Sequence, residues 1–111
     1  MNFTRVVKVT TASADAEILQ QEVVKQAIKN CLGLDEAAYQ SRLVEEPPKM
    51  DKQGFIMSFD IISDVDTPFI INGESQALIG GTAYSSGGVV KVTSIKMHGV
   101  GSAVIAMNIR S

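Results

Sequence analysis

The stretch SQALIGGTAYSSGGVVKVTSIKMHGVGSAVIAMNIRS, residues 75–111, decides the fold of this chain. It alternates β-branched and apolar runs with breaks rich in glycine and serine, which is typical of strands joined by tight turns. The breaks at 85–88 and 98–101 contain the residues that turns with positive φ require. Because strands that follow one another through short turns are usually antiparallel neighbours, the stretch predicts an antiparallel meander.

The glycines of this stretch are interpreted as turn residues. Gly87-Gly88 is followed by Val-Val-Lys-Val, which is a strand pattern, whereas a phosphate-binding P-loop opens a helix. The Gly99–Gly101 segment has two glycines, fewer than a dinucleotide fingerprint needs, and no helix pattern follows it. Gly80-Gly81 lies inside an expected strand, where it indicates a bulge, a bend or a close approach of another backbone.

Strand patterns also precede residue 75. In GFIMSFDII, residues 54–62, alternate positions from Phe55 to Ile61 are apolar and form one face. Asn72-Gly73 is a strong signal for a two-residue hairpin turn. The strands expected after Gln53 are residues 55–62, 69–72, 76–84, 89–97 and 102–110.

The first third of the chain predicts a strand and a helix. Phe3–Val9 is rich in β-branched residues and is expected to be a strand. Residues 14–32 show a helical period, with Ser13 as the expected N-cap and Gly33 as the residue that ends the helix. The apolar residues of this stretch are expected to form one broad face: Ile18, Leu19, Val23, Val24, Ala27, Ile28, Cys31 and Leu32.

A short second helix is expected from about Asp35 to Val44, ended by Pro47 and Pro48. The predicted fold class is therefore α+β. One long N-terminal helix packs on a curved antiparallel β-meander of about six strands. With 111 residues and 45% hydrophobic residues, the chain is expected to form a single domain, residues 1–111.

Composition excludes some classes of protein. A formal net charge of −2 argues against a general nucleic-acid footprint. The only cysteine, Cys31, has no partner for an intramolecular disulfide, and the N-terminal residues contain no apolar run of signal-peptide length. These features predict a soluble cytoplasmic protein without membrane association.

No catalytic or metal-binding constellation is recognised, and no cofactor is expected. His98 is the only histidine and follows an expected strand, so it is interpreted as a turn residue. Cys31 lies on the apolar helix face and is interpreted as a buried thiol. Asp60, Asp64 and Asp66 lack the spacing of a calcium loop and are interpreted as turn and solubility residues. The sequence therefore favours a non-catalytic protein.

Charge is distributed unevenly along the chain. Residues 35–74 contain nine acidic and three basic residues, whereas residues 75–111 contain three basic residues and no acidic one. Both alternating sets of the C-terminal strands are small or apolar, so a partner is expected to cover part of the sheet, unless a strongly curved sheet wraps around its own core and hides both sets in part. The expected partner is a second copy of the chain, which makes the protein an assembly subunit or a protein-binding or inhibitor module. The interface candidates are Ala77, Ile79, Gly80, Gly81, Val90, Val92, Ser94, Val104 and Ala106.

Two alternatives stay open. A small-ligand-binding protein or enzyme of a cone-shaped α+β fold would have a pocket between helix and sheet. A protein that binds single-stranded nucleic acid would use the acid-free strands, with one aromatic residue for stacking. The residues for that role are Tyr84, Lys91, Lys96, His98 and Arg110.

Overall fold

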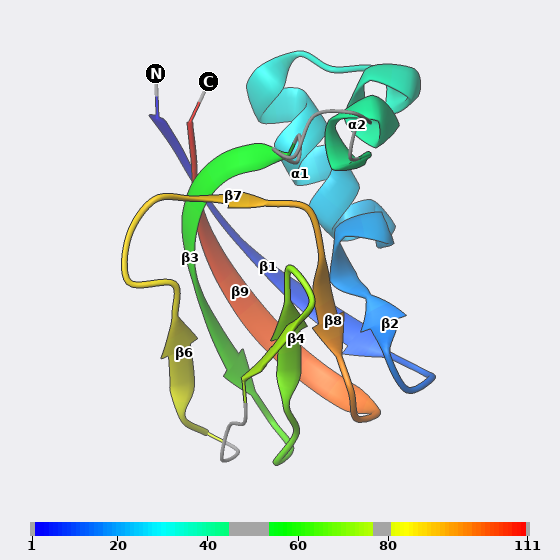
Figure 1. The fold of residues 1–111 in the computed structure, drawn as a ribbon, viewed down its shortest axis with the longest axis vertical. Helices are drawn as coiled ribbons and strands as arrows, with labels where there is room; N and C mark the ends of the chain where they lie inside the picture. Colours follow the sequence, from blue (N-terminus) through cyan, green and yellow to red (C-terminus); the bar gives the residue numbers. More distant parts are fainter. Residues whose placement is uncertain (1, 45–53, 77–80, 111) are drawn as a thin grey trace.

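Residues 2–44, 54–76 and 81–110 are described by the computed structural model. In these ranges the chain forms two antiparallel sheets, two α-helices and one 3-10 helix (Figure 1). The strands are β1 (Asn2–Thr11), β2 (Ala16–Glu17), β3 (Phe55–Ser63), β4 (Phe69–Ile71), β5 (Glu74–Gln76), β6 (Ala83–Ser85), β7 (Val90–Val92), β8 (Ile95–Met97) and β9 (Gly101–Arg110). The helices are η1 (Ile18–Gln20), α1 (Glu22–Leu32) and α2 (Glu36–Leu43).

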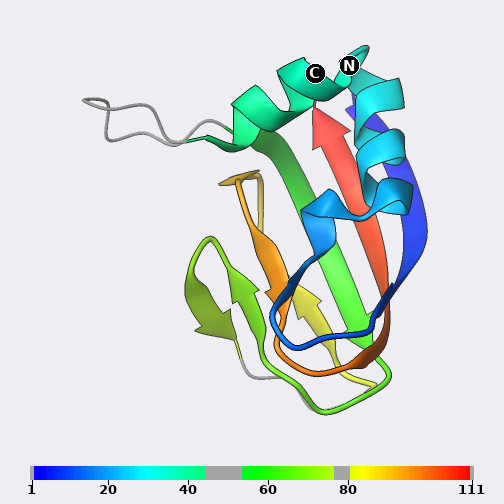
Figure 2. The same ribbon diagram turned by 90° about the vertical axis from the view of Figure 1, so that its right-hand side faces the viewer.

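The larger sheet joins the two ends of the chain. Its order is β1-β9-β3, and the far side of β3 pairs with β7 at one end and with β6 at the other. Strand β9 pairs with β1 along its whole length, from Asn2 opposite Arg110 to Thr11 opposite Gly101. The smaller sheet has the order β2-β8-β4-β5. In Figure 2 it lies beside the lower part of the larger sheet, and α1 and α2 lie at the upper end.

The core lies between the sheets and the helices. The alternation predicted for β3 is confirmed, since Phe55, Met57, Phe59 and Ile61 are buried. In β9 the buried set is Ala103, Ile105, Met107 and Ile109. The largest buried side chains include Tyr39, whose hydroxyl donates to the Leu19 carbonyl oxygen at 2.5 Å and so fixes α2 against η1.

The predicted fold class is wrong in its main features. The described residues are mostly β, with 48% in strands and 23% in helices, and they form two sheets rather than one meander. The described residues form nine strands where six were expected. The run 89–97 is divided between the two sheets as β7 and β8, β2 forms inside the expected long helix, and β5 forms at Glu74–Gln76, before most of the expected run 76–84. Two short helices replace the one long N-terminal helix. The class is an α+β mixture with two sheets.

The long helix fails at its start. Asp15 has a positive φ of 58°, and the next two residues pair with β8 as strand β2. The Glu17 carboxylate accepts hydrogen bonds from the backbone N–H groups of Leu19 and Ile95 and from the Ser94 hydroxyl. These contacts with β8 outweigh the helical periodicity, so α1 begins only at Glu22. Its predicted end is confirmed, because Gly33 adopts φ 67° there.

The second helix and the hairpin are confirmed, while Pro47 and Pro48, which were expected to end the helix, lie outside the described residues. Helix α2 has Asp35 as its N-cap, with the side chain accepting from the Ala38 N–H at 2.7 Å. Strands β4 and β5 form the hairpin predicted at Asn72-Gly73, and both turn residues have positive φ, as a type I′ turn requires. Among the described residues, neither α-helix is long and apolar enough to span a bilayer.

The run from Val89 to Met97 is not one strand. It bends at Thr93-Ser94, so that β7 joins the larger sheet and β8 the smaller one. The Asn72 side chain stabilises the bend, because its Oδ1 atom accepts from both N–H groups of the bend and its amide donates to the Lys91 carbonyl at 2.8 Å. The bend lets one apolar run contribute to both sheets.

Candidate functional site

The face of the larger sheet that points away from the core contains exposed apolar side chains. In one row across the strands, Val6 lies beside Ala106, and Ala106 lies beside Asp60. In the next row, Lys8 is followed by Val104, Ile62 and Ala83. We call the five apolar residues of these rows the outer patch: Val6, Ile62, Ala83, Val104 and Ala106.

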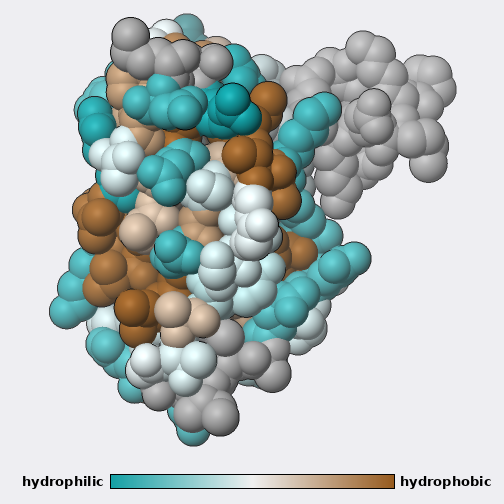
Figure 3. Space-filling view, turned by 90° about the vertical axis from the view of Figure 1, so that its left-hand side faces the viewer, coloured by the Kyte–Doolittle hydropathy of each residue, from teal (hydrophilic) through white to brown (hydrophobic). Residues whose placement is uncertain are grey.

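The outer patch is unusually open for apolar residues. The exposed fractions are 64% for Val6, 45% for Ile62 and 38% for Val104. Figure 3 views this side of the molecule and shows one group of apolar surface at its left margin, around and below mid-height, and a second group at the upper right. Single exposed apolar residues are ordinary, but neighbours in adjacent rows form a continuous surface that is typical of an interaction site.

Two charged residues lie at opposite corners of the patch. Lys8 is on β1 in the row of Val104, and Asp60 is on β3 in the row of Val6. Polar pairs bound the patch along the strands, where Thr4 donates to Asn108 at 2.9 Å. The patch therefore has an apolar centre with one basic and one acidic corner.

The predicted interface residues divide between the surface and the interior. Val104 and Ala106 lie in the outer patch. Val92 is fully buried in the core, and Ser94 is half-buried with its hydroxyl donating to Glu17. Val90 lines a cavity, and Gly81 lies in a turn with φ 81°. Ala77, Ile79 and Gly80 lie outside the described residues.

Sequence reasoning missed Val6 and Ile62 as members of the same surface. Each belongs to the less apolar alternation of its own strand, and the two are far apart in sequence. The signal that could have found them is the pairing register, because β9 lies between β1 and β3 and brings both beside Val104 or Ala106. The periodicity of a single strand does not show how that strand is aligned with its neighbours.

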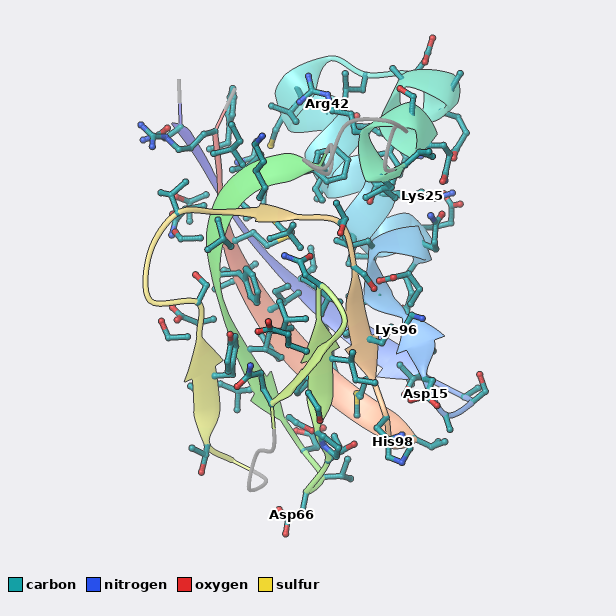
Figure 4. All side chains as sticks on the ribbon, viewed as in Figure 1. Asp15, Lys25, Arg42, Asp66, Lys96 and His98 are labelled. Carbon is teal, nitrogen blue, oxygen red and sulfur yellow. The ribbon has the colours of Figure 1, made fainter. Side chains whose placement is uncertain are left out.

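The residues considered for nucleic-acid binding are not brought together. Lys91 and Arg110 lie in one row of the larger sheet, on either side of Ile56. Lys96 lies in the smaller sheet opposite Glu17, and His98 pairs with Asp15 at 2.8 Å (Figure 4). The Tyr84 ring packs towards the core with its centroid 6.0 Å from that of Phe59. Lys91 and Arg110 thus share a row of the larger sheet, whereas Lys96 lies in the smaller sheet and His98 lies just after it.

A cavity of about 230 Å³ lies between the two sheets rather than between helix and sheet. It is lined by Phe59, Ile71, Asn72, Glu74, Gln76, Tyr84, Ser86 and Val90. The Asn72 and Ser86 side chains are engaged with the backbone. Half of the lining residues are polar, and a space of this size suits a small organic molecule better than a macromolecule.

The helices carry a cluster of ion pairs. Lys25 is nearly buried, and its ammonium group lies 3.1 Å from Glu36 and 3.4 Å from Glu22. Glu36 also contacts Lys29 at 3.3 Å and accepts from the Gln40 amide at 2.7 Å. The hydrogen bond from Gln40, followed by that from Lys25, lowers the pKa of Glu36 to about 2. This arrangement joins α1 to α2 and contains no reactive group.

Acid titration should reveal this cluster. The pKa of Glu36 is lowered by folding, so its ionised form stabilises the fold above its ordinary pKa of 4.5, and this contribution is lost as the pH falls towards 2. We expect Glu36→Gln to be less stable than the wild type at pH 6 and closer to it at pH 2, in urea unfolding followed by circular dichroism. Glu74→Gln, far from the helices, is the control. A stability difference that does not change with pH would contradict this assignment.

In the described residues, the side chains that could catalyse a reaction or bind a metal ion are not clustered. No three of their His, Cys, Asp or Glu side chains are grouped so that they could hold a metal ion. Cys31 is buried on α1, as expected. Asp60 and Asp64 are exposed on β3 and just after it. The outer patch is therefore the feature of the described surface that most clearly indicates a binding role.

Comparison of the chain with protein-family models, with curated proteins and with solved structures finds no match in any of the three.

Proposed function

We propose that this protein is a non-catalytic assembly subunit that associates with a second copy of itself through the outer patch. The observation that carries the proposal is the exposure of Val6, Ile62 and Val104 side by side on an open sheet face. Burying apolar surface contributes about 25 cal/mol per Å², so a partner that covers these side chains gains free energy. Two sheets packed face to face are an established way to do so.

The charges of the patch favour a second copy as the partner. Lys8 and Asp60 occupy one pair of opposite corners, and Val6 and Ile62 occupy the other pair. A two-fold axis that runs in the interface from the Val6 corner to the Ile62 corner would place each Lys8 over Asp60 of the partner subunit. The apolar residues of the two copies would meet between these ion pairs. The arrangement of charged and apolar residues is thus self-complementary, as an isologous dimer interface must be.

Substitution within the patch should weaken association. We expect Val104→Lys to weaken self-association by about 30-fold or more, because a hot-spot change at the centre of an interface costs about 2 kcal/mol or more. Light scattering at several concentrations measures the mass. Val100→Lys is the matched control, since Val100 is 57% exposed in the turn before β9 and lies outside the patch. A wild type that remains monomeric at high concentration would refute the proposal.

The ion pairs allow a stricter form of this test. Lys8→Glu and Asp60→Lys should each weaken association by placing like charges together, whereas the double variant should restore it. Restoration would identify the two corners as direct partners across the interface. Independent losses that simply add would show that the second copy is oriented differently.

A further inference from the structure

A second binding surface lies at the free edge of the larger sheet. Strand β1 pairs with β9 on one side only, and it forms the margin of the sheet in Figure 2. Helix α1 lies over the inner face near β1. A long edge strand presents unpaired backbone groups that can pair with another strand.

Hydrogen bonds show which residues of β1 face this edge. The Arg5 guanidinium donates to the Thr4 carbonyl at 2.8 Å, and the Gln21 amide donates to the Thr10 carbonyl at 3.0 Å. Both carbonyls therefore point away from β9. Because the backbone groups of alternate residues point to the same side of a strand, Val6 and Lys8 also direct their N–H and C=O groups to the edge.

The pairing of β9 with β3 also indicates that the even-numbered residues of β1 face the free edge. The Ser102 carbonyl accepts from the Asp64 N–H at 2.9 Å, so the even-numbered residues of β9 bond towards β3. Its odd-numbered residues consequently bond towards β1, where they pair with odd-numbered partners such as Val7 opposite Ile105. Val6 and Lys8 are left with backbone groups that have no partner among the described residues.

The segment of the β1 edge whose backbone groups are unpaired is symmetric about Val7. The two carbonyls bonded by side chains, those of Thr4 and Thr10, lie at equal separations in sequence on either side of Val7. An antiparallel copy of β1 centred on Val7 would place Val6 opposite Lys8 of the partner subunit, and Thr4 opposite Thr10 of the partner subunit. The open groups of each strand would then meet those of the other.

Charge also restricts the register. Centring the pair on Arg5 or on Lys8 would place like charges directly opposite each other, which is destabilising. Registers centred on Val6 or Val7 avoid this. In the register centred on Val6, Lys8 lies opposite Thr4, whose carbonyl already accepts from Arg5. In the register centred on Val7, the unpaired backbone groups of Val6 meet those of Lys8 of the partner subunit.

We infer that β1 pairs antiparallel with β1 of a second copy, about a two-fold axis at Val7. This interface uses the backbone edge of β1, whereas the outer patch uses side chains on the sheet face, including that of Val6, and edge pairing makes one continuous sheet from the two larger sheets. With two different self-complementary surfaces, each subunit can join more than one neighbour. The dimer expected from the outer patch would then be a unit of a larger assembly.

Disulfide trapping tests the register. In the Val7 register, the two Val7 residues form a non-hydrogen-bonded pair with Cα atoms about 4.5 Å apart, which is within disulfide range. We expect Val7→Cys in a Cys31→Ala background to form covalent dimers on mild oxidation, at least tenfold more than Val6→Cys in the same background. Covalent dimers from Val6→Cys alone would overturn the Val7 register. No covalent dimer from either variant would overturn edge pairing.

A proline substitution tests the backbone bonds. Lys8→Pro removes an N–H group that faces the edge, so it should leave the pairing of β1 with β9 intact. Combined with Val7→Cys, we expect it to reduce covalent trapping at least tenfold, whereas Lys8→Ala, which keeps the N–H group, should reduce trapping much less. Equal trapping in both would overturn the inference. Circular dichroism checks that both variants are folded, and light scattering of Val104→Lys reports on the outer patch separately.

Discussion

Ile28→Asp is expected to destabilise the fold more than any other substitution considered. Ile28 is fully buried on α1, in the cluster that joins the helix to both sheets. The substitution removes a large apolar side chain and places a carboxylate without a partner in the core, which costs several kcal/mol. Since domains of this size are stable by about 5–15 kcal/mol, the loss takes a large share of the total.

Val23→Asp provides the matched control on the same helix. The sequence placed Val23 on the buried stripe, but its side chain is 44% exposed, so the acid would remain in water near the start of α1. We expect Val23→Asp to change the unfolding free energy by less than about 1 kcal/mol, since acids are favourable near a helix N-terminus. Urea unfolding of both variants measures the contrast, and equal effects would show that the buried face of α1 is assigned wrongly.

Asn72→Ala is expected to have the second largest effect, about 4 kcal/mol, from three lost hydrogen bonds and about 1 kcal/mol of backbone strain. The side chain makes hydrogen bonds to the backbone at Lys91, Thr93 and Ser94, each worth about 1 kcal/mol net. Its φ of 51° adds strain for alanine, since residues other than glycine and asparagine rarely adopt this conformation. Loss of these contacts should loosen the bend between β7 and β8.

Asn72→Gly separates the two contributions. Glycine tolerates the positive φ but makes no side-chain hydrogen bonds, so it should be more stable than alanine by about 1 kcal/mol and still less stable than the wild type. Thermal unfolding of the three proteins measures both differences. If Asn72→Ala were as stable as the wild type, the side chain would not be what stabilises the bend.

The elements predicted correctly are those with a strong local signal. The alternation in β3, the hairpin at Asn72-Gly73 and the end of α1 at Gly33 each depend on residues close together in the sequence. The start of α1 was predicted wrongly because Glu17 bonds to β8, which lies far along the chain. The apolar pattern of residues 14–32 gives no sign of that contact.

The candidate site was predicted only in part. Val104 and Ala106 were chosen because the C-terminal strands lack acids, and both lie in the outer patch. Val92 was chosen by the same reasoning, yet it is buried. Which face of a strand is buried depends on the strands with which it pairs, and the composition of the strand does not reveal this. The basic residues were treated as one surface, and the bend at Thr93-Ser94 places Lys91 and Lys96 in different sheets.

The sequence by itself determined that this protein is an antiparallel β structure with helices, since alternation, turn residues and helix-ending glycine act over a few residues. Only the tertiary structure decided that there are two sheets and that Val6, Ile62 and Val104 form one surface. The physical reason is that strand register and sheet membership follow from hydrogen bonds between distant segments and from burial of a shared core. Those interactions exist only once the chain has folded.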